Sequence, residues 1–136
     1  MKQLALAALL TLPAVQALAA AHAMPGVTAA DQSVANGVVS AESVVAGETG
    51  WMVVHRTDAE MKPGPVVGYA PLRAGENMDV AAILSEPVEP GEMLMLMVHS
   101  EAGGTQTGIF EYTLGATEDG PIRIEGNLVM QVVTAQ

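Results

Sequence analysis

The chain has 136 residues, of which 15 are Asp or Glu and only 5 are Lys or Arg, and it contains no cysteine. Its formal net charge of −10 argues against nucleic acid and anionic membrane surfaces as partners, because both are bound through clustered Lys and Arg side chains. The lack of cysteine excludes disulfides and thiol chemistry, so the fold must be held together by its core alone.

The first 23 residues have the pattern of a secretory signal peptide. A positively charged start is followed by an apolar stretch over residues 4–18 and by several small-x-small cleavage sites over residues 17–23. Pro13 interrupts the apolar stretch, which is also short for a membrane anchor. We therefore expect a periplasmic or extracellular protein without an integral membrane span after cleavage. Residues 24–136 then suit a single acidic domain.

The remaining chain alternates apolar and polar residues with a period of two, and turn residues separate the alternating stretches. Strands are expected over residues 32–35, 38–45, 51–57, 66–72, 78–84, 92–100, 107–114, 122–125 and 128–134. The first two would form a hairpin around Asn36-Gly37, a pair that favours the positive φ of a tight turn. No stretch longer than a turn keeps a helical period. The pattern predicts an all-β fold, an Ig-like antiparallel β-sandwich of about eight or nine short strands.

Residues 92–100 are the most informative stretch, because both faces of this expected strand are apolar. In an extended strand the three methionines and His99 share one face, and the two leucines and Val98 share the other. This predicts a central strand that is covered on both sides, or one whose second face meets something other than water. Trp51 begins a similar stretch and is expected to pack in the core.

Five short motifs in a fixed order resemble a known family. They are D-Q-S-V at 31–34, G-W-M-V-V-H at 50–55, G-P-V-V-G at 64–68, M-V-H-S-E-A-G at 97–103 and G-I-F-E-Y at 108–112. The set is similar to an uncharacterised domain of secreted and cell-surface proteins, common in halophilic archaea and also found in bacteria. The resemblance spans residues 31–133 and implies an extracytoplasmic β-sandwich, with no established activity or catalytic residue. Glu101 departs from the aspartate that the family pattern leads us to expect.

No catalytic motif is present. The sequence lacks G-x-S-x-G, H-E-x-x-H and Walker-type patterns, and His99 and Ser100 are adjacent in a strand, so their side chains point apart. Glu118 and Asp119 lie in turn-like sequence, where solvated carboxylates are expected. We therefore expect no enzyme and no catalytic residue.

The first functional hypothesis is a non-catalytic binding or structural module without a cofactor. It would present the loops of residues 58–64 and 101–107, at one end of the sandwich, to an unknown protein or surface partner.

The alternative is a soluble periplasmic copper-binding protein. Nine methionines and three histidines supply thioether and imidazole groups, which suit copper in an oxidising compartment. The candidate ligands are His55, His99, Met95 and Met97, and the segment containing His22 and Met24 is a possible additional arm. Methionines also fill cores, and histidines also end strands with backbone partners. Two imidazoles within about 4 to 5 Å of each other would favour the metal, whereas placement on opposite faces would exclude it.

Overall fold

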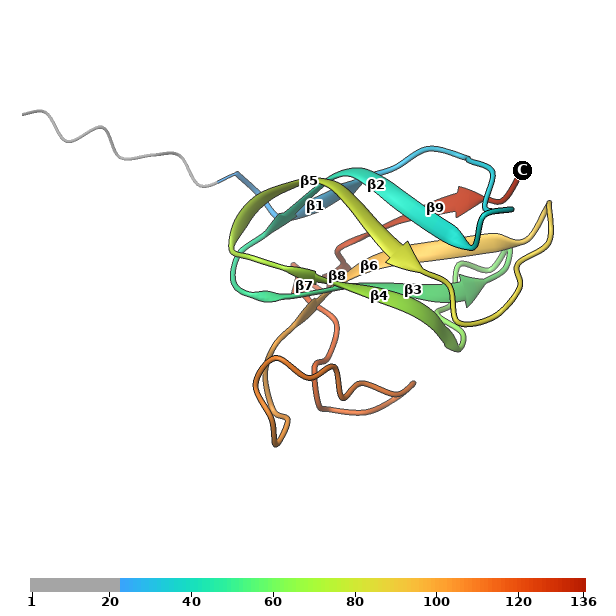
Figure 1. The fold of residues 1–136 in the computed structure, drawn as a ribbon. Coiled ribbons are helices and arrows are strands. Elements are labelled where there is room, and N and C mark those ends of the chain that lie inside the picture. The colour runs from blue at the N-terminus through green and yellow to red at the C-terminus, as the bar shows by residue number, and fades with distance from the viewer. Residues whose placement is uncertain (1–22) are drawn as a thin grey trace, which may run out of the picture.

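The computed structural model describes residues 23–136, and they form nine strands (Figure 1). The strands are β1 (Gly26–Thr28), β2 (Val38–Ala46), β3 (Gly50–Thr57), β4 (Val66–Leu72), β5 (Gly75–Ile83), β6 (Met93–Ser100), β7 (Arg123–Ile124), β8 (Asn127–Leu128) and β9 (Met130–Thr134). The expected signal peptide lies outside the described residues except for Ala23. Within residues 23–136, no helix has the length and apolar character needed to cross a membrane.

The strands build two main sheets that face each other. One sheet has the order β1-β2-β5, the other has the order β4-β3-β6-β9, and all of their strand pairs are antiparallel. Strands β7 and β8 form a separate small hairpin. Figure 1 shows β2 and β5 in one layer above β3, β4 and β6. The prediction of an all-β sandwich of about nine strands is confirmed, and the finer Ig-like topology stays a prediction.

The core between the sheets is aliphatic and is supplied by alternate residues of the facing strands, as the period of two requires. Its largest members on β3 and β6 are Met52, Val54, Leu94, Leu96 and Val98. These side chains are at most 2% exposed. Burial of this apolar surface is the main source of stability in a domain without disulfides.

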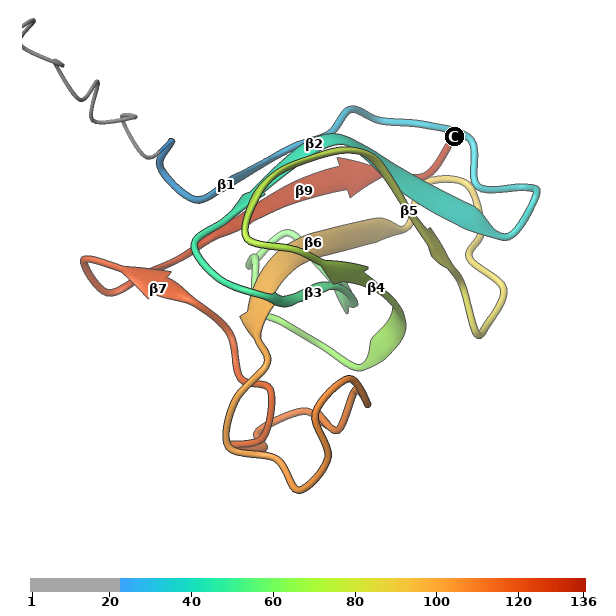
Figure 2. The ribbon, with the colours of Figure 1, turned by 60° about the vertical axis from the view of Figure 1, so that its left-hand side comes forward.

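The second face of β3 and β6 is buried as well. Val53 and His55 of β3, and Met95, Met97 and His99 of β6, are each at most 1% exposed, yet they do not belong to the core between the sheets. Residues 101–121, drawn in orange, leave the end of β6 and lie on the side of this sheet that faces away from β2 and β5 (Figures 1 and 2). The central strand that residues 92–100 predict is thus confirmed, and its methionine face is buried beneath a loop.

Trp51 is buried as expected, at 7% exposed, but it lies on this outer face and not between the two sheets. Its indole ring packs edge-on against Tyr69 and Phe110, with ring centroids 5.7 and 5.5 Å away. The alternation along β3 explains the outcome, because Met52 and Val54 already occupy the inner face.

The expected hairpin of residues 32–35 with 38–45 does not form. The Gln32 side chain accepts a hydrogen bond from the Ser40 backbone N–H at 2.9 Å and donates one to the Ser40 carbonyl at 2.8 Å. The Gln32 side-chain amide therefore replaces the backbone hydrogen bonds of a strand pair. The strand that pairs with β2 is β1, in place of residues 32–35. Gly37 keeps the expected positive φ, at 76°.

The expected strand over residues 107–114 is also absent. Gly108 has a φ of 82°, which interrupts an extended backbone. The Glu111 carboxylate accepts hydrogen bonds from the backbone N–H groups of Thr105 and Gln106, at 2.8 and 3.1 Å. The segment is ordered by side-chain acceptors, which a periodicity of apolar residues does not reveal.

We predict that Leu96→Ala lowers the free energy of unfolding by about 2 to 5 kcal/mol, because it leaves a cavity in the closed core between the sheets. Urea unfolding followed by circular dichroism measures the change. The matched control is Ile83→Ala, at a side chain that is 78% exposed, which should cost less than about 1 kcal/mol. Equal losses for the two variants would contradict this placement of the core.

Candidate metal centre

Two histidines far apart in sequence meet on the buried outer face. In the β3–β6 register His55 lies opposite Met95 and His99 lies opposite Trp51, with the pair Val53 and Met97 between these rows. The imidazoles lean toward each other along this face, and their Nε2 atoms are 3.4 Å apart. The ring centroids are 5.5 Å apart. Both residues are at most 1% exposed, so the two nitrogens face each other away from water.

The other nitrogen of each ring is bound to a backbone carbonyl. His55 Nδ1 lies 2.8 Å from the Gly64 oxygen, and His99 Nδ1 lies 2.6 Å from the Asp119 oxygen. A carbonyl oxygen only accepts, so both Nδ1 atoms must carry the hydrogen and donate it. A neutral imidazole has one N–H, which leaves a lone pair on each Nε2. The two Nε2 atoms, which lie 3.4 Å apart, are therefore both hydrogen-bond acceptors, and neither carries a hydrogen to donate to the other.

A tight loop after β3 positions the Gly64 carbonyl. The Gly64 N–H donates to the Arg56 carbonyl at 2.8 Å, and the Thr57 hydroxyl donates to the Lys62 carbonyl at 2.8 Å. A Cβ atom at position 64 would lie 2.7 Å from the Arg56 oxygen, so only glycine allows this close approach. The glycine thus folds the loop back over the sheet and fixes the tautomer of His55.

Asp119 positions the second carbonyl and closes the 101–121 segment. Its carboxylate oxygens accept hydrogen bonds from the backbone N–H groups of Ala102 and Glu111, at 3.2 and 2.8 Å, and its own N–H donates to the Ala102 carbonyl. Asp119 is fully buried and has a φ of 46°, in the left-handed region. The expectation of a solvated carboxylate is wrong here. An Asp before Gly-Pro signals a turn but gives no sign that the turn is buried.

Tyr112 packs against both imidazoles. Its ring centroid lies 4.5 Å from that of His99 and 5.8 Å from that of His55, at interplanar angles of 81° and 71°. Its hydroxyl accepts a hydrogen bond from the Gly115 N–H at 3.3 Å. Tyr112 is itself 8% exposed, so this T-shaped packing makes its ring part of the buried cluster around the histidine pair.

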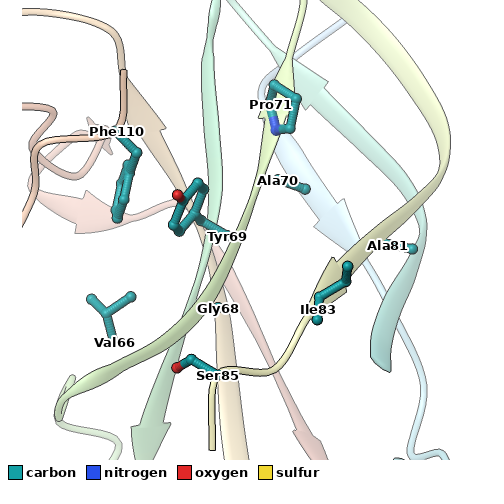
Figure 3. Close-up of a pocket in the computed structure, with 9 residues that line it drawn as sticks. All are labelled: Val66, Gly68, Tyr69, Ala70, Pro71, Ala81, Ile83, Ser85 and Phe110. Carbon is teal, nitrogen blue, oxygen red and sulfur yellow. The ribbon is translucent and has the colours of Figure 1, made fainter. Parts of the chain in front are cut away.

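An aromatic stack continues outward from this ring. Phe110 and Tyr69 stack with centroids 4.2 Å apart, and both line an open groove of about 580 Å³ along β4 and β5 (Figure 3). Val66, Ile83 and Ser85 also line the groove, and neither histidine does. The groove is thus separate from the histidine pair.

Burial keeps both histidines neutral. Desolvation lowers the pKa of His99 to about 4, with the hydrogen bond to the Asp119 carbonyl acting in the opposite direction and the nearby His55 adding to the decrease. Desolvation likewise lowers the pKa of His55, against the effect of its hydrogen bond to Gly64. At neutral pH a proton therefore does not occupy the space between the two Nε2 atoms.

The donors available to a cation on this face are nitrogen and sulfur. Met97 lies in the row between the two histidines, and Met95 lies opposite His55. No group of three or more His, Cys, Asp or Glu side chains suited to a metal forms within residues 23–136. Of the proposed arm, His22 lies outside the described residues, and Met24 is 72% exposed. The structure thus brings together His55 and His99 and buries both candidate methionines on their face.

The expectation that residues 58–64 and 101–107 lie at one end of the sandwich is wrong. Thr57 pairs with Met93, whereas Gly50 pairs with Ser100, so the loops that follow β3 and β6 begin at opposite ends of the strand pair. Gly64 in the first, and Asp119 at the end of the segment that contains the second, supply the two carbonyls that orient the imidazoles.

We predict that metal-free protein loses stability as the pH falls from 7 to 5. The folded pKa of His99 lies below its ordinary value of 6.5, so the unfolded chain binds more protons in this window and gains on the folded state. The expected loss is about 2 kcal/mol for His99, and His55 adds to it. Glu92 and Glu111, whose pKa values are also lowered, titrate below this window.

Urea unfolding at pH 7 and pH 5 tests this, with His99→Gln as the variant that lacks one titrating ring. The variant should show a distinctly smaller decrease in unfolding free energy between the two pH values. A wild-type unfolding free energy that is constant between them would rule out buried neutral histidines.

We also predict the tautomers. Long-range ¹⁵N–¹H correlation of the imidazoles in metal-free protein at pH 7 should show a protonated Nδ1 and an unprotonated Nε2 for both His55 and His99. Single His→Gln variants assign the signals. A protonated Nε2 on either ring would mean that one histidine donates to the other.

The comparisons with known proteins give a family and no activity. A family model described as a domain of unknown function, DUF7282, matches residues 25–136. No curated protein and no solved structure matches the chain. The matched range covers both histidines, both orienting loops and all nine described strands. The chain therefore belongs to the DUF7282 family of domains of unknown function.

Proposed function

We propose that this protein is a secreted, non-catalytic binding domain that holds one transition-metal ion between His55 and His99. The observation that carries the proposal is the 3.4 Å approach of two buried Nε2 atoms whose tautomers leave a lone pair on each. Copper binding was the alternative to a partner-binding module on sequence grounds. The geometry of the histidine pair moves metal binding to first place.

A cation satisfies both nitrogens, which otherwise carry a cost. A buried polar group without a hydrogen-bond partner costs about 1 to 3 kcal/mol, and here two acceptors face each other. An imidazole nitrogen binds a first-row metal at roughly 2.0 to 2.1 Å. Two nitrogens 3.4 Å apart can therefore contact the same ion.

The other possible occupants fit less well. A shared proton requires one imidazolium, and burial lowers the pKa of both rings. A water that donates to both nitrogens would lie about 2.8 Å from each, which closes the N···O···N angle to roughly 75°. The hydrogens of water span a wider angle, so at least one of these bonds would be bent.

The polar groups around the pair support a binding role over catalysis. His99 Nδ1 is committed to the Asp119 carbonyl, and both Asp119 carboxylate oxygens accept backbone N–H groups. The Ser100 hydroxyl donates to the Gly120 carbonyl at 3.4 Å. No nucleophile with an adjacent free base is therefore formed at this end of β6.

A protein or surface partner stays a prediction. The two loops proposed to meet that partner begin at opposite ends of the β3–β6 pair, so they do not form a shared docking end. Secretion rests on the signal-peptide pattern of residues 1–23.

The test is a metal titration of processed protein purified without an affinity tag. After chelation, the protein is titrated with Cu(I) under reducing conditions, and with Cu(II), Co(II) and Zn(II), each against a chelator of known affinity. We expect one ion per chain, and a loss of affinity of at least about 100-fold in His55→Gln and in His99→Gln, since each removes a direct ligand.

An exposed methionine of the other sheet provides the control. Met78→Leu changes a thioether on β5 that is 62% exposed, and this variant should bind the metal as wild type does. Circular dichroism and urea unfolding confirm that each variant folds. Unchanged affinity in both His55→Gln and His99→Gln would overturn the proposal, as would the absence of stoichiometric binding of any of these ions.

A further inference from the structure

We infer that the ion held by this site is Cu(I) and that the Met97 thioether is its third ligand. This inference rests on the proposed function, which requires only the two histidines. It adds the oxidation state of the ion and a ligand from the same chain.

The separation of the two nitrogens calls for a third ligand. An ion about 2.0 Å from each Nε2, with the nitrogens 3.4 Å apart, subtends an N–metal–N angle of roughly 120°. A two-coordinate ion between two equivalent ligands favours a linear arrangement, which would need the nitrogens about 4 Å apart. An angle near 120° is that of a trigonal site, and a trigonal site has one more position to fill.

Met97 occupies the place from which that position can be filled. The two imidazoles reach toward each other from the rows of His55 and His99, and the row between them contains Val53 and Met97. Met97 is 1% exposed and lies on the same face of β6 as His99, two residues away. Met95 is equally buried but lies in the row of His55, at one end of the site.

The charge of the donor set favours a monovalent ion. Two imidazoles and a thioether are neutral, and the cost of burying an ion grows with the square of its charge. Asp119 orients His99 through its backbone carbonyl. Its carboxylate is occupied elsewhere, because it accepts hydrogen bonds from the N–H groups of Ala102 and Glu111. Within residues 23–136 no carboxylate joins the histidines to neutralise a divalent ion.

The kind of donor points in the same direction. Thioether sulfur is a soft ligand that selects Cu(I), whereas Zn²⁺ is usually held by four ligands and Cu(II) prefers tetragonal nitrogen and oxygen sites. Tyr112 packs against both imidazoles, which are at most 1% exposed, so water, the usual additional ligand of divalent ions, has little access to the site. A small, dry, three-ligand site therefore fits Cu(I) best.

The test compares Met97→Leu with Met95→Leu, two volume-conserving changes on the same strand face. Cu(I) affinity is measured against a chelator, and X-ray absorption of the Cu(I) protein reports whether sulfur binds the metal. For Met97→Leu we expect about a 10- to 100-fold loss of Cu(I) affinity and loss of the sulfur signal. Met95→Leu should keep both, and wild type should bind Cu(I) more tightly than Zn(II) or Co(II).

The outcomes separate this inference from the proposed function. If His55→Gln and His99→Gln lose metal but Met97→Leu keeps wild-type Cu(I) affinity and the sulfur signal, the metal site stands and the Met97 ligand is refuted. Tighter binding of a divalent ion than of Cu(I) refutes the oxidation state alone. If the two His→Gln variants bind Cu(I) as wild type does, both the site and this inference fall.

Discussion

Two backbone carbonyls determine the chemistry of the buried outer face. By accepting the Nδ1 hydrogens of His55 and His99, the carbonyls of Gly64 and Asp119 leave a lone pair on each Nε2, and these two Nε2 atoms lie 3.4 Å apart. A backbone carbonyl is a more constant orienting group than a carboxylate, because it neither titrates nor rotates independently of the chain. The course of the main chain thus determines the tautomer of both histidines.

The sheet of β4, β3, β6 and β9 separates two buried clusters of different composition. On one side lies an aliphatic core typical of a sandwich, and on the other lies a smaller cluster of aromatic, sulfur and imidazole groups. The 101–121 segment that covers the second cluster has no regular ladder. Buried or hydrogen-bonded carboxylates hold it instead, among them Asp119 and Glu111, whose pKa is lowered by its bonds to Thr105 and Gln106.

Periodicity predicted the parts of this architecture that depend on alternation. Both apolar faces of residues 92–100, and the placement of His99 with the methionines, follow from the extended backbone alone. The approach of His55 to His99 did not follow, since strand register is a long-range property. The burial of Asp119 was not predicted for another reason. It depends on a loop whose course is set by side-chain hydrogen bonds, whereas the local sequence pattern is that of a solvent-exposed turn.

The cover over the outer face also divides the methionines by their exposure to oxidants. Met24, Met61 and Met78 are 72%, 45% and 62% exposed, whereas Met95 and Met97 are at most 1% exposed. Conversion of a thioether to its sulfoxide needs access to the sulfur. In the presence of an oxidant, the surface methionines would react first and consume part of it. The sulfur atoms of Met95 and Met97, which are buried on the face that the 101–121 segment covers, would remain thioethers, the form that binds soft metal ions.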